Sequence, residues 1–554
     1  MKSAASYSAA RPAGTFKGML GAIALAAAVT LPLPQAFAAE VLRIGVSQPI
    51  DSLNPFVANS DYSSIAYQYA YPFLTVYDAD LNIVPYFATD WTVSSDGTVW
   101  TFHTREGAKW SDGKPLTAKD AAFTYTMIQK YKTSTTGKFA GGLNHLKSAE
   151  ATDDNTLVLT YDGPGGDVPV KMQGMPILPA HIWSKVAGED GSEIDSFENA
   201  APWVSGGPFM LSGYKKNQLA LFKVNPNWWG DTRPKIDGFG LQFFANSDAM
   251  VSALTSNQLD MVGQTISPTA VDALKAAGMV VESAPSTGFH EMIINTNPEK
   301  TGHHELLNPK VREAFELAID RDAIVKQVWL GFATPGTTIV APATGWHDET
   351  LATVSLSIDK ANAILDELGY VRGADGVRIA DGVRMDYDVV FSTEVAGAGD
   401  RTFKIIQASY EKIGVRLAQR KMDADATNAA ILGEDNQYRD FDIAMWLWVP
   451  PFDPDFILSV LTCAQLGNNN DSGYCNPDYD KLYMEQARLV DRAERAKVLN
   501  EMQAIAYRDR PYIVLVYPQT MEAHSPEWTG FVPSPLVGSV NNLSVETLLN
   551  VHKE

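Results

Sequence analysis

The chain has 554 residues, 12 tryptophans, 21 tyrosines and a formal net charge of −21. This length exceeds what one hydrophobic core supports, so two or three lobes are expected. The acidic balance argues against nucleic acid and anionic membrane surfaces as partners, because like charges repel.

The first segment has the features of a secretory signal peptide. Basic residues and no acid precede an apolar run over residues 18–31, and Ala36 and Ala38 occupy the small-residue positions before a cleavage site. The apolar run is shorter than the roughly 20 residues that cross a bilayer. We therefore expect removal of residues 1–38, no membrane anchor and a periplasmic location in a Gram-negative cell.

The first half of the mature chain predicts short strands and amphipathic helices. Thr117 and Asp120 have the spacing of a capping box, which predicts a helix that begins after Thr117. Asp96-Gly97 is a tight-turn signal between two alternating strands. The other expected elements are a strand at 42–46, a helix at 61–74 and strands at 155–161 and 208–224.

The second half alternates helices with strands, which predicts an α/β class. Residues 308–329 have the 3.6-residue period of two helices, and Asp320 is expected to cap the second. A doubled hexapeptide at 374–385 predicts two Asp-Gly turns that flank a short strand. The other expected elements are helices at 359–370, 401–415 and 491–507 and strands at 441–448 and 512–518.

Only two cysteines occur, Cys463 and Cys475, on either side of a polar loop. In an exported protein this spacing favours a disulfide. Two free thiols are the alternative, and a metal site is less favoured because no histidine or further cysteine lies near.

The patterns of common catalytic sites are missing from the sequence. No Gly-x-Ser-x-Gly segment and no glycine-rich phosphate loop occurs. His303 and His304 resemble a zinc-peptidase start, but the residue four after His304 is Asn308. We therefore predict no catalytic residue, no metal and no cofactor, and a secreted hydrolase is a remote alternative.

Four segments together resemble family 5 extracellular solute-binding proteins, the receptors of bacterial ABC importers for dipeptides, oligopeptides and related solutes. They are 98–125 (TVWTFHTREGAKWSDGKPLTAKDAAFTY), 205–239, 308–325 (NPKVREAFELAIDRDAIV) and 473–482 (GYCNPDYDKL). The resemblance implies a large two-lobed periplasmic-binding-protein fold of the α/β class, type II, with an extra inserted domain and the ligand enclosed between the lobes.

The resemblance also implies a division of the chain. Lobe I would consist of residues 39–82, 203–300 and 521–554, with an inserted domain at 83–202 and a lobe III at 301–520. We expect the chain to cross between lobes I and III near Asn295 and Pro518.

The segment MWLWVPPFDPDF, residues 445–456, is the predicted ligand-binding site, because its counterpart in the family lines the ligand cavity. Trp446 and Trp448 lie two apart, so on an extended segment they face the same side and can form one wall. Core packing beneath the loop is the alternative for both tryptophans.

The two aspartates of this segment, Asp453 and Asp455, are the candidate polar contacts. Peptide receptors of the family carry an aspartate three residues before the Asp-Pro pair, where it binds the α-ammonium of the peptide. In this sequence that position is Pro450. Asp453 or Asp455 would have to replace the missing group, although an aspartate before proline also commonly forms a turn.

The function that these observations predict is a periplasmic receptor, not an enzyme. Its partners would be a small-molecule solute and the permease of an ABC importer, and the receptor would be a monomer. A peptide is the favoured solute, and an oligosaccharide, an opine or another amino-acid conjugate is the alternative. Partnership with a chemoreceptor, or a periplasmic chaperone role, could coexist with transport.

Overall fold

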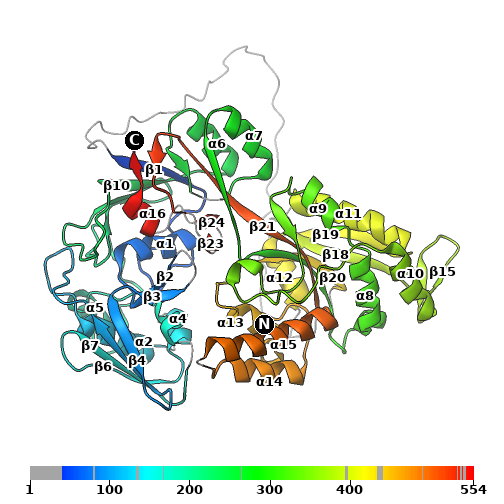
Figure 1. Ribbon diagram of the computed structural model, residues 1–554, viewed down its shortest axis with the longest axis horizontal. Coiled ribbons are helices and arrows are strands. Elements are labelled where there is room, and N and C mark those ends of the chain that lie inside the picture. Colours follow the sequence, from blue (N-terminus) through cyan, green and yellow to red (C-terminus); the bar gives the residue numbers. More distant parts are fainter. Residues whose placement is uncertain are drawn as a thin grey trace, which may run out of the picture. The chain divides into compact units, whose positions relative to one another are not determined.

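A computed structural model gives the architecture of the chain (Figure 1). It describes residues 40–78, 82–132, 136–165, 168–263, 265–393, 397–432, 441–489, 491–532, 535–536, 539–540 and 545–554. The expected signal peptide, residues 1–38, lies outside these ranges. None of the described helices is both long and apolar enough to cross a bilayer.

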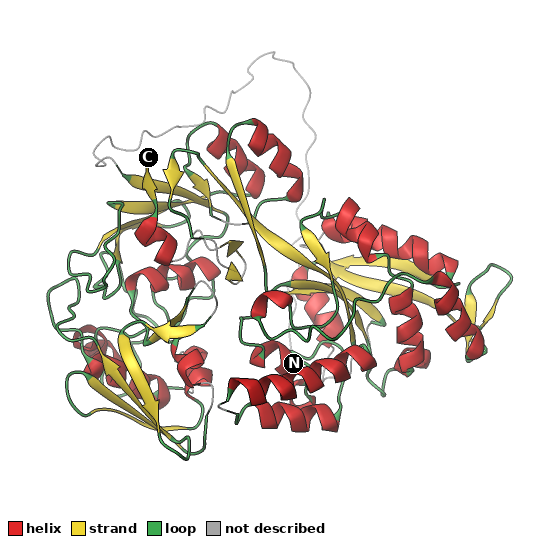
Figure 2. Ribbon diagram, viewed as in Figure 1, coloured by secondary structure: helices red, strands yellow, loops and turns green. Residues whose placement is uncertain are grey.

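A 12-stranded sheet forms the centre of the molecule (Figures 1 and 2). Its main path runs β19 (Arg416–Met422), β18 (Asp386–Ser392), β20 (Ile443–Trp448), β13 (Phe289–Ile294), β21 (Tyr512–His524), β11 (Met261–Val262), β1 (Val41–Val46), β10 (Gly238–Phe243), β9 (Leu219–Val224) and β8 (Phe209–Lys215). Strands β12 (Val280–Pro285) and β14 (Ala333–Pro335) also pair with β21. Strand β21 therefore belongs to both halves of the sheet.

The two halves of β21 have different antiparallel partners. Residues 512–516 pair with β13, and residues 519–524 pair with β12. The chain passes from β12 to β13 through Ser286–Gly288, and Ser286 Oγ donates a hydrogen bond to the Pro518 carbonyl at 3.0 Å. The two connections between the halves of the sheet thus lie side by side. Asn295, near which the sequence placed the first crossing, follows β13, and the division into lobes stays a prediction.

Side-chain alternation along β13 and β20 separates two hydrophobic cores. Met292 and Met445 face a core that contains helices α8 to α11, which we call the α8–α11 core. Phe289, Ile293 and Ala444 face a core that contains α12 to α15, which we call the α12–α15 core. The helices are α8 (Pro309–Leu317), α9 (Arg321–Gln327), α10 (Ile358–Glu367), α11 (Ala398–Lys412), α12 (Ala424–Leu432), α13 (Asp455–Ser459), α14 (Pro477–Gln486) and α15 (Arg492–Asp509).

Two further cores lie on the other side of the sheet connections. The larger unites the first strands with the four-stranded sheet described next, and a smaller one surrounds β11. The helices of this part are α1 (Asp61–Ala70), α3 (Gly137–Ala140), α4 (Val168–Met172), α5 (Ala180–Ala187), α6 (Ser247–Thr255), α7 (Val271–Ala276) and α16 (Val545–Asn550). Short paired strands are β2 (Thr75–Tyr77) with β3 (Ile83–Pro85), β22 (Trp528–Thr529) with β25 (His552–Lys553), and β23 (Pro535–Leu536) with β24 (Ser539–Val540).

A separate antiparallel sheet has the order β4 (Ala88–Val93), β5 (Val99–Thr104), β7 (Thr156–Tyr161) and β6 (Leu146–Ala151), and helix α2 (Ala118–Lys130) packs on it. The predicted capping box is confirmed: Thr117 accepts from the Lys119 backbone, and the Asp120 carboxylate accepts from the Thr117 backbone. The turn between β4 and β5 is also confirmed, and Gly97 there has φ +71°, which only glycine adopts without strain.

Most elements expected in the second half are present. Asp320 caps α9 through the backbone of Ala323, as the sequence predicts. The doubled hexapeptide forms strands β16 (Arg378–Ala380) and β17 (Val383–Arg384), which pair with the preceding β15 (Val371–Arg372) in a three-stranded sheet. Its two turns place Gly376 and Gly382 at positive φ. Two differences are helix α12, which the sequence did not predict, and β21, which extends to His524, six residues beyond the predicted strand.

Candidate functional site

Trp446 and Trp448 lie on β20 and face the same side of the sheet. Both are half-buried and pack against the α12–α15 core. Trp448 contacts Phe456 edge-on, with ring centroids 5.8 Å apart. The predicted shared face is confirmed, and the rings combine core packing with residual exposure. Contact with a solute stays a prediction.

The loop after β20 is tied to the crossing segment between β12 and β13. The Thr287 hydroxyl donates to the Pro450 carbonyl at 2.6 Å, and both residues are buried. Pro450, the position at which the family resemblance predicts a missing peptide-binding aspartate, thus has a structural contact. The bond also links the tryptophan-bearing strand to one of the two connections between the halves of the sheet.

Asp453 forms a bidentate ion pair with Arg495 of α15. The two N–O distances are 2.6 and 2.7 Å, and the side chains are 11% and 9% exposed. Arg495 also lies over the Trp346 ring at 5.1 Å. Such paired planar groups fix geometry well. The sequence reading of Asp453 as a turn former also fits, since Asp453 Oδ1 accepts the Asp455 backbone N–H at 3.0 Å.

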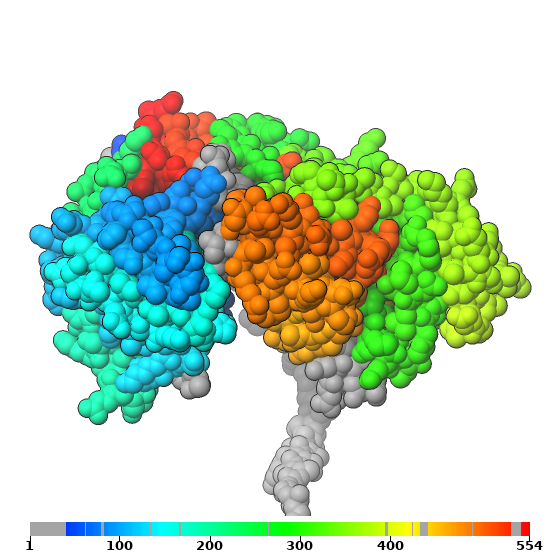
Figure 3. All heavy atoms as spheres, turned by 60° about the horizontal axis from the view of Figure 1, so that its bottom comes forward, coloured from blue at the N-terminus to red at the C-terminus, as the bar shows by residue number. Residues whose placement is uncertain are grey.

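Asp455 belongs to the same polar network. Gln486 Nε2 donates to Asp455 Oδ1 at 2.7 Å, and Arg495 Nε donates to Gln486 Oε1 at 2.9 Å. Four side chains from the loop, α14 and α15 therefore hold the start of α13 in place. Helices α14 and α15, coloured orange, form part of the molecular surface (Figure 3). A solute contact by either aspartate stays a prediction.

Phe452, in the same loop, has a partner that the sequence did not indicate. The Tyr77 ring of β2 packs edge-on against it, with centroids 5.6 Å apart. Burial and the nearby Asp453 carboxylate raise the pKa of Tyr77, while Arg495 opposes the shift. The contact joins the β2–β3 hairpin to the loop, and no local sequence pattern predicts a contact over such a separation.

Glu291 is the second residue that the sequence reading missed. It lies in the middle of β13, opposite Trp446 on β20 and Val514 on β21, and is 0% exposed. Burial raises the pKa of Glu291 well above its ordinary range, and the Asp471 carboxylate, where it is ionised, raises this pKa further. A glutamate in a run of buried apolar residues (FHEMII) was the available signal.

The predicted disulfide between Cys463 and Cys475 is present. Cys475 precedes Asn476, whose side chain caps α14 through the backbone of Asp478 and Tyr479. The bridge therefore attaches the polar loop to the start of helix α14. Asp471, in the same loop, accepts a hydrogen bond from the Tyr512 hydroxyl, and burial raises the pKa of Asp471 to about 7.

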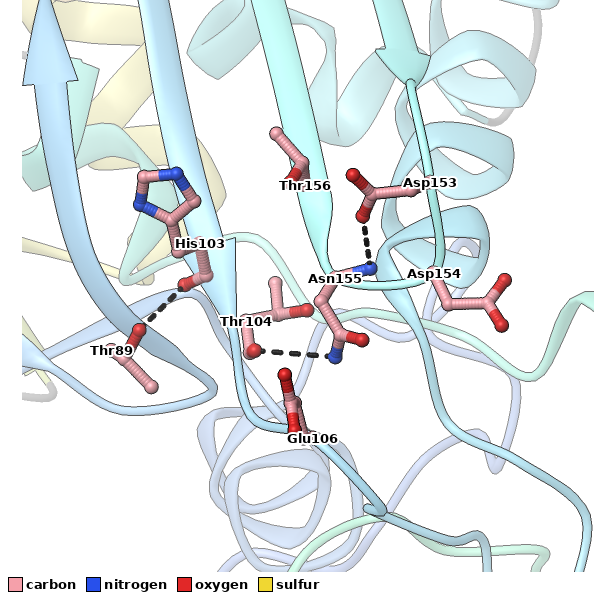
Figure 4. A pocket seen from close by; sticks show the side chains of 8 residues that line it. All are labelled: Thr89, His103, Thr104, Glu106, Asp153, Asp154, Asn155 and Thr156. Atoms are coloured by element: carbon pink, nitrogen blue, oxygen red, sulfur yellow. Dashed lines mark hydrogen bonds between the residues drawn. The ribbon is translucent and has the colours of Figure 1, made fainter.

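Two hollows of the described structure differ in their relation to Trp446 and Trp448, which we call the tryptophan wall: the first lies away from it, and the second touches it at Trp446. A shallow polar depression of about 900 Å³ lies on the four-stranded sheet. Figure 4 shows its lining residues, Thr89, His103, Thr104, Glu106, Asp153, Asp154, Asn155 and Thr156. Asp153 accepts the Asn155 backbone N–H as part of a turn, and His103 pairs with Asp90 at 2.6 Å. Asp153 and His103 thus have partners within the protein, and we assign no ligand to the depression.

A second, water-sized cavity of about 10 Å³ lies between the sheet and α11, and its lining includes His290, Glu291, Thr402 and Trp446. Burial lowers the pKa of His290 to about 4, so its imidazole is neutral at pH 7. The ring packs edge-on against Trp329, with centroids 5.0 Å apart. Among the described residues, no group of three or more histidine, cysteine or acidic side chains has the arrangement of a metal site.

Two halves of one sheet that share a long strand, with paired connections between them, define the two-lobed class of solute-binding proteins. The family model of bacterial extracellular solute-binding proteins, family 5 (middle region), matches residues 82–469. The chain belongs to this family. The expectation drawn from the four sequence segments is therefore confirmed.

Individual relatives cover nearly the whole chain. Protein XP55 of Streptomyces lividans is 28% identical over 92% of this chain and 89% of its own. The glutathione-binding protein GsiB of Escherichia coli K12 is 24% identical over 94% of this chain and 97% of its own. The structure is similar to the ABC transporter-associated periplasmic binding protein DppA of Helicobacter pylori in complex with the peptide STSA. That likeness has a TM-score of 0.71 and 23% identity, and covers 93% of this chain and 98% of DppA.

Proposed function

We propose that this chain is the solute receptor of an ABC importer, and that its solute is a peptide or a peptide-like molecule. The carrying observation is the segment from Trp446 to Asp455. It presents two half-buried indoles on one face and runs into a loop that its own ion pair and the Thr287 bond hold rigid. Aromatic faces with a few fixed polar groups are typical of small-solute sites.

The relatives support this class of solute. GsiB is named for glutathione, a tripeptide, and the DppA structure holds a tetrapeptide. The missing aspartate at Pro450 separates this chain from receptors that bind a free peptide ammonium there. An oligosaccharide, an opine or another amino-acid conjugate remains the alternative, since indole faces also stack on sugar rings.

Capture would occur by hinge closure. The connections at Ser286–Gly288 and around Pro518 lie side by side, and only these two backbone segments join β12 to β13 and the two halves of β21. Bending there would change the angle between the halves without disturbing either core. The closed receptor would deliver its solute to an inner-membrane permease, and would act as a monomer in the periplasm with no catalytic turnover.

The test is ligand-dependent stabilisation combined with direct identification. Purified protein from its native host is denatured, and the small molecules released are identified by mass spectrometry. The identified solute is then added back, and the rise in melting temperature and its chemical integrity are both measured. A saturable rise with an unchanged solute supports the receptor, whereas conversion of the solute would indicate an enzyme.

A further inference from the structure

Glu291 is a carboxylate without a partner in the interior of the sheet. It is 0% exposed, and neither Oε1 nor Oε2 has a hydrogen-bond partner within the described ranges. Its position between Phe289 and Ile293 directs its side chain toward the α12–α15 core. Buried polar groups in native proteins are almost always bonded, so this one requires an explanation.

Among the residues that the structure describes, the surroundings of Glu291 add a second acidic group, Asp471, and supply no cation. Asp471 is close enough to raise the pKa of Glu291, and Tyr512 donates its hydroxyl to Asp471. The buried cations of the same part of the chain bind other groups. Arg378 pairs with Asp366, Arg495 pairs with Asp453, and Arg312 donates to the carbonyls of Leu306 and Asp509. Lys300 pairs with Asp442 at 2.6 Å, and Arg321 pairs with Glu316 at 2.9 Å.

A buried, unpaired acid is costly, and an apolar side chain of similar size would be at least as stable there. The stability of the fold therefore does not explain why an acid occupies this position. A cation that belongs to the solute, and not to the chain, would give Glu291 the partner that it lacks. The same chain lacks the ammonium-binding aspartate at Pro450, so its solute needs another acidic contact if it is cationic.

The strand register provides a route from the tryptophan wall to Glu291. Trp448 is opposite Phe289, and Trp446 is opposite Glu291. One such step of two residues along a strand is about 7 Å. This is comparable to the reach of an extended lysine or arginine side chain. The half-buried indoles on the way attract cations through their ring faces.

We propose that Glu291 binds a protonated amine or guanidinium group carried by the solute, which reaches it along Trp448 and Trp446. This inference rests on the proposed receptor function and narrows its solute to those with a cationic side chain. The acidic contact would come from a strand of the central sheet and not from the loop before the Asp-Pro pair.

The test compares matched solutes on matched proteins by isothermal titration calorimetry. The probes are tripeptide pools with lysine or arginine at one position, and the same pools with norleucine at that position. Free lysine, arginine and putrescine form a separate arm. The proteins are wild type, Glu291→Gln and the control Glu485→Gln, which removes the same charge from an exposed position on α14.

The expected result is at least tenfold tighter binding of the lysine or arginine pool than of the norleucine pool by wild type and by Glu485→Gln. Glu291→Gln should abolish this difference. Two outcomes would contradict the cation site but not the receptor function. The first is peptide binding without a preference for cationic side chains, and the second is a preference that persists in Glu291→Gln. Glu291-dependent binding of the free amines without peptide binding overturns the peptide receptor and leaves the cation site. If no probe binds, the proposal that the solute carries a cationic side chain is contradicted.

A second measurement needs no variant and covers the case in which Glu291→Gln does not fold. Titration of wild type at pH 7 in two buffers of different ionisation enthalpy reports protons released on binding. A cation that binds the Glu291 carboxylate lowers the raised pKa of this group and favours release of its proton, so the lysine pool should release more protons than the norleucine pool. Equal proton release by the two pools contradicts the proposal.

Discussion

Asp453 and Arg495 are 42 residues apart in the chain and form a bidentate ion pair beneath the loop that follows β20. Gln486 extends this pair to Asp455, so both predicted ligand-binding aspartates have partners inside their own lobe. A carboxylate held in this way positions the loop that carries it. The pair therefore restricts the conformations of the loop, as a preformed site requires.

Replacement of Asp453 by Asn should lower the free energy of unfolding by about 3 kcal/mol, because it leaves Arg495 buried without its counter-charge. The measurement is urea denaturation of the mature protein. The control is Glu494→Gln on the same helix, whose partner Lys497 is exposed, and this change should cost less than about 1 kcal/mol. If the two substitutions lower the free energy of unfolding equally, the buried pair of Asp453 and Arg495 contributes no more to stability than an exposed pair.

The sequence predicted this loop correctly in its local features and missed its long-range partner. Asp453 before Pro454 was read as a possible turn former, and the bond from the Asp455 backbone shows that turn. Arg495 lies in α15. The periodicity of the sequence predicts this helix but does not predict which loop it contacts. Local patterns depend on neighbours a few residues apart, whereas ion pairs across a lobe depend on tertiary packing.

Reduction of the Cys463–Cys475 bridge should lower the free energy of unfolding by about 3 kcal/mol, since the bridge closes a short loop in the unfolded chain. The fold should survive, because the hydrophobic cores do not depend on the bridge. Denaturation of the Cys463→Ser, Cys475→Ser double mutant against wild type provides the measurement. Alkylation of denatured, unreduced wild-type protein should find no free thiol, and two free thiols would contradict the bridge.

The central strand β21 shows the same limit of sequence reading on a larger scale. Residues 512–518 (YIVLVYP) form an apolar run that predicts a strand. Residues 519–524 (QTMEAH) contain Glu522 and His524, which are buried in the observed strand. These polar residues do not have the apolar pattern of a buried strand. The sequence therefore predicts only about half of β21, the strand that joins the halves of the sheet. Helices with caps, such as α2 and α9, were predicted well because their signals are local.

Asp471 should make the stability of the protein fall as the pH rises from about 4 to 7. Burial raises its pKa in the folded protein from an ordinary 3.8 to about 7. Over this range the unfolded chain has released the proton while the folded chain keeps it, so ionisation favours unfolding. Asp471→Asn removes this contribution. Its stability relative to wild type should therefore increase between pH 4 and pH 7, by on the order of 1–4 kcal/mol.

Denaturation curves of both proteins at pH 4, 5, 6 and 7 measure this difference and cancel the titration of the other carboxylates. A difference between Asp471→Asn and wild type that stays constant across the range would show that Asp471 is already ionised in the folded protein at pH 4.

Ordinary dipeptides and tripeptides without a cationic side chain should bind poorly. Pro450 offers no carboxylate for the α-ammonium, and an ammonium that loses its partner on burial commonly costs several kcal/mol. A loss of about 3 kcal/mol reduces affinity more than a hundredfold. Calorimetry with a dipeptide pool of neutral side chains measures this. Micromolar affinity for that pool would show that another acidic group, such as Asp453 or Asp455, binds the ammonium.

Trp446→Ala and Trp448→Ala should each weaken binding of the natural solute by more than about 1 kcal/mol, because each removes a half-buried ring face from the proposed wall. Titration of the solute identified from the native host measures the loss. The control is Trp91→Ala, since Trp91 is also half-buried but lies on the four-stranded sheet, where it packs against Phe102. That change should leave affinity unaltered. A Trp446→Ala, Trp448→Ala double mutant that folds and keeps full affinity would show that both rings serve only the core around α12 to α15.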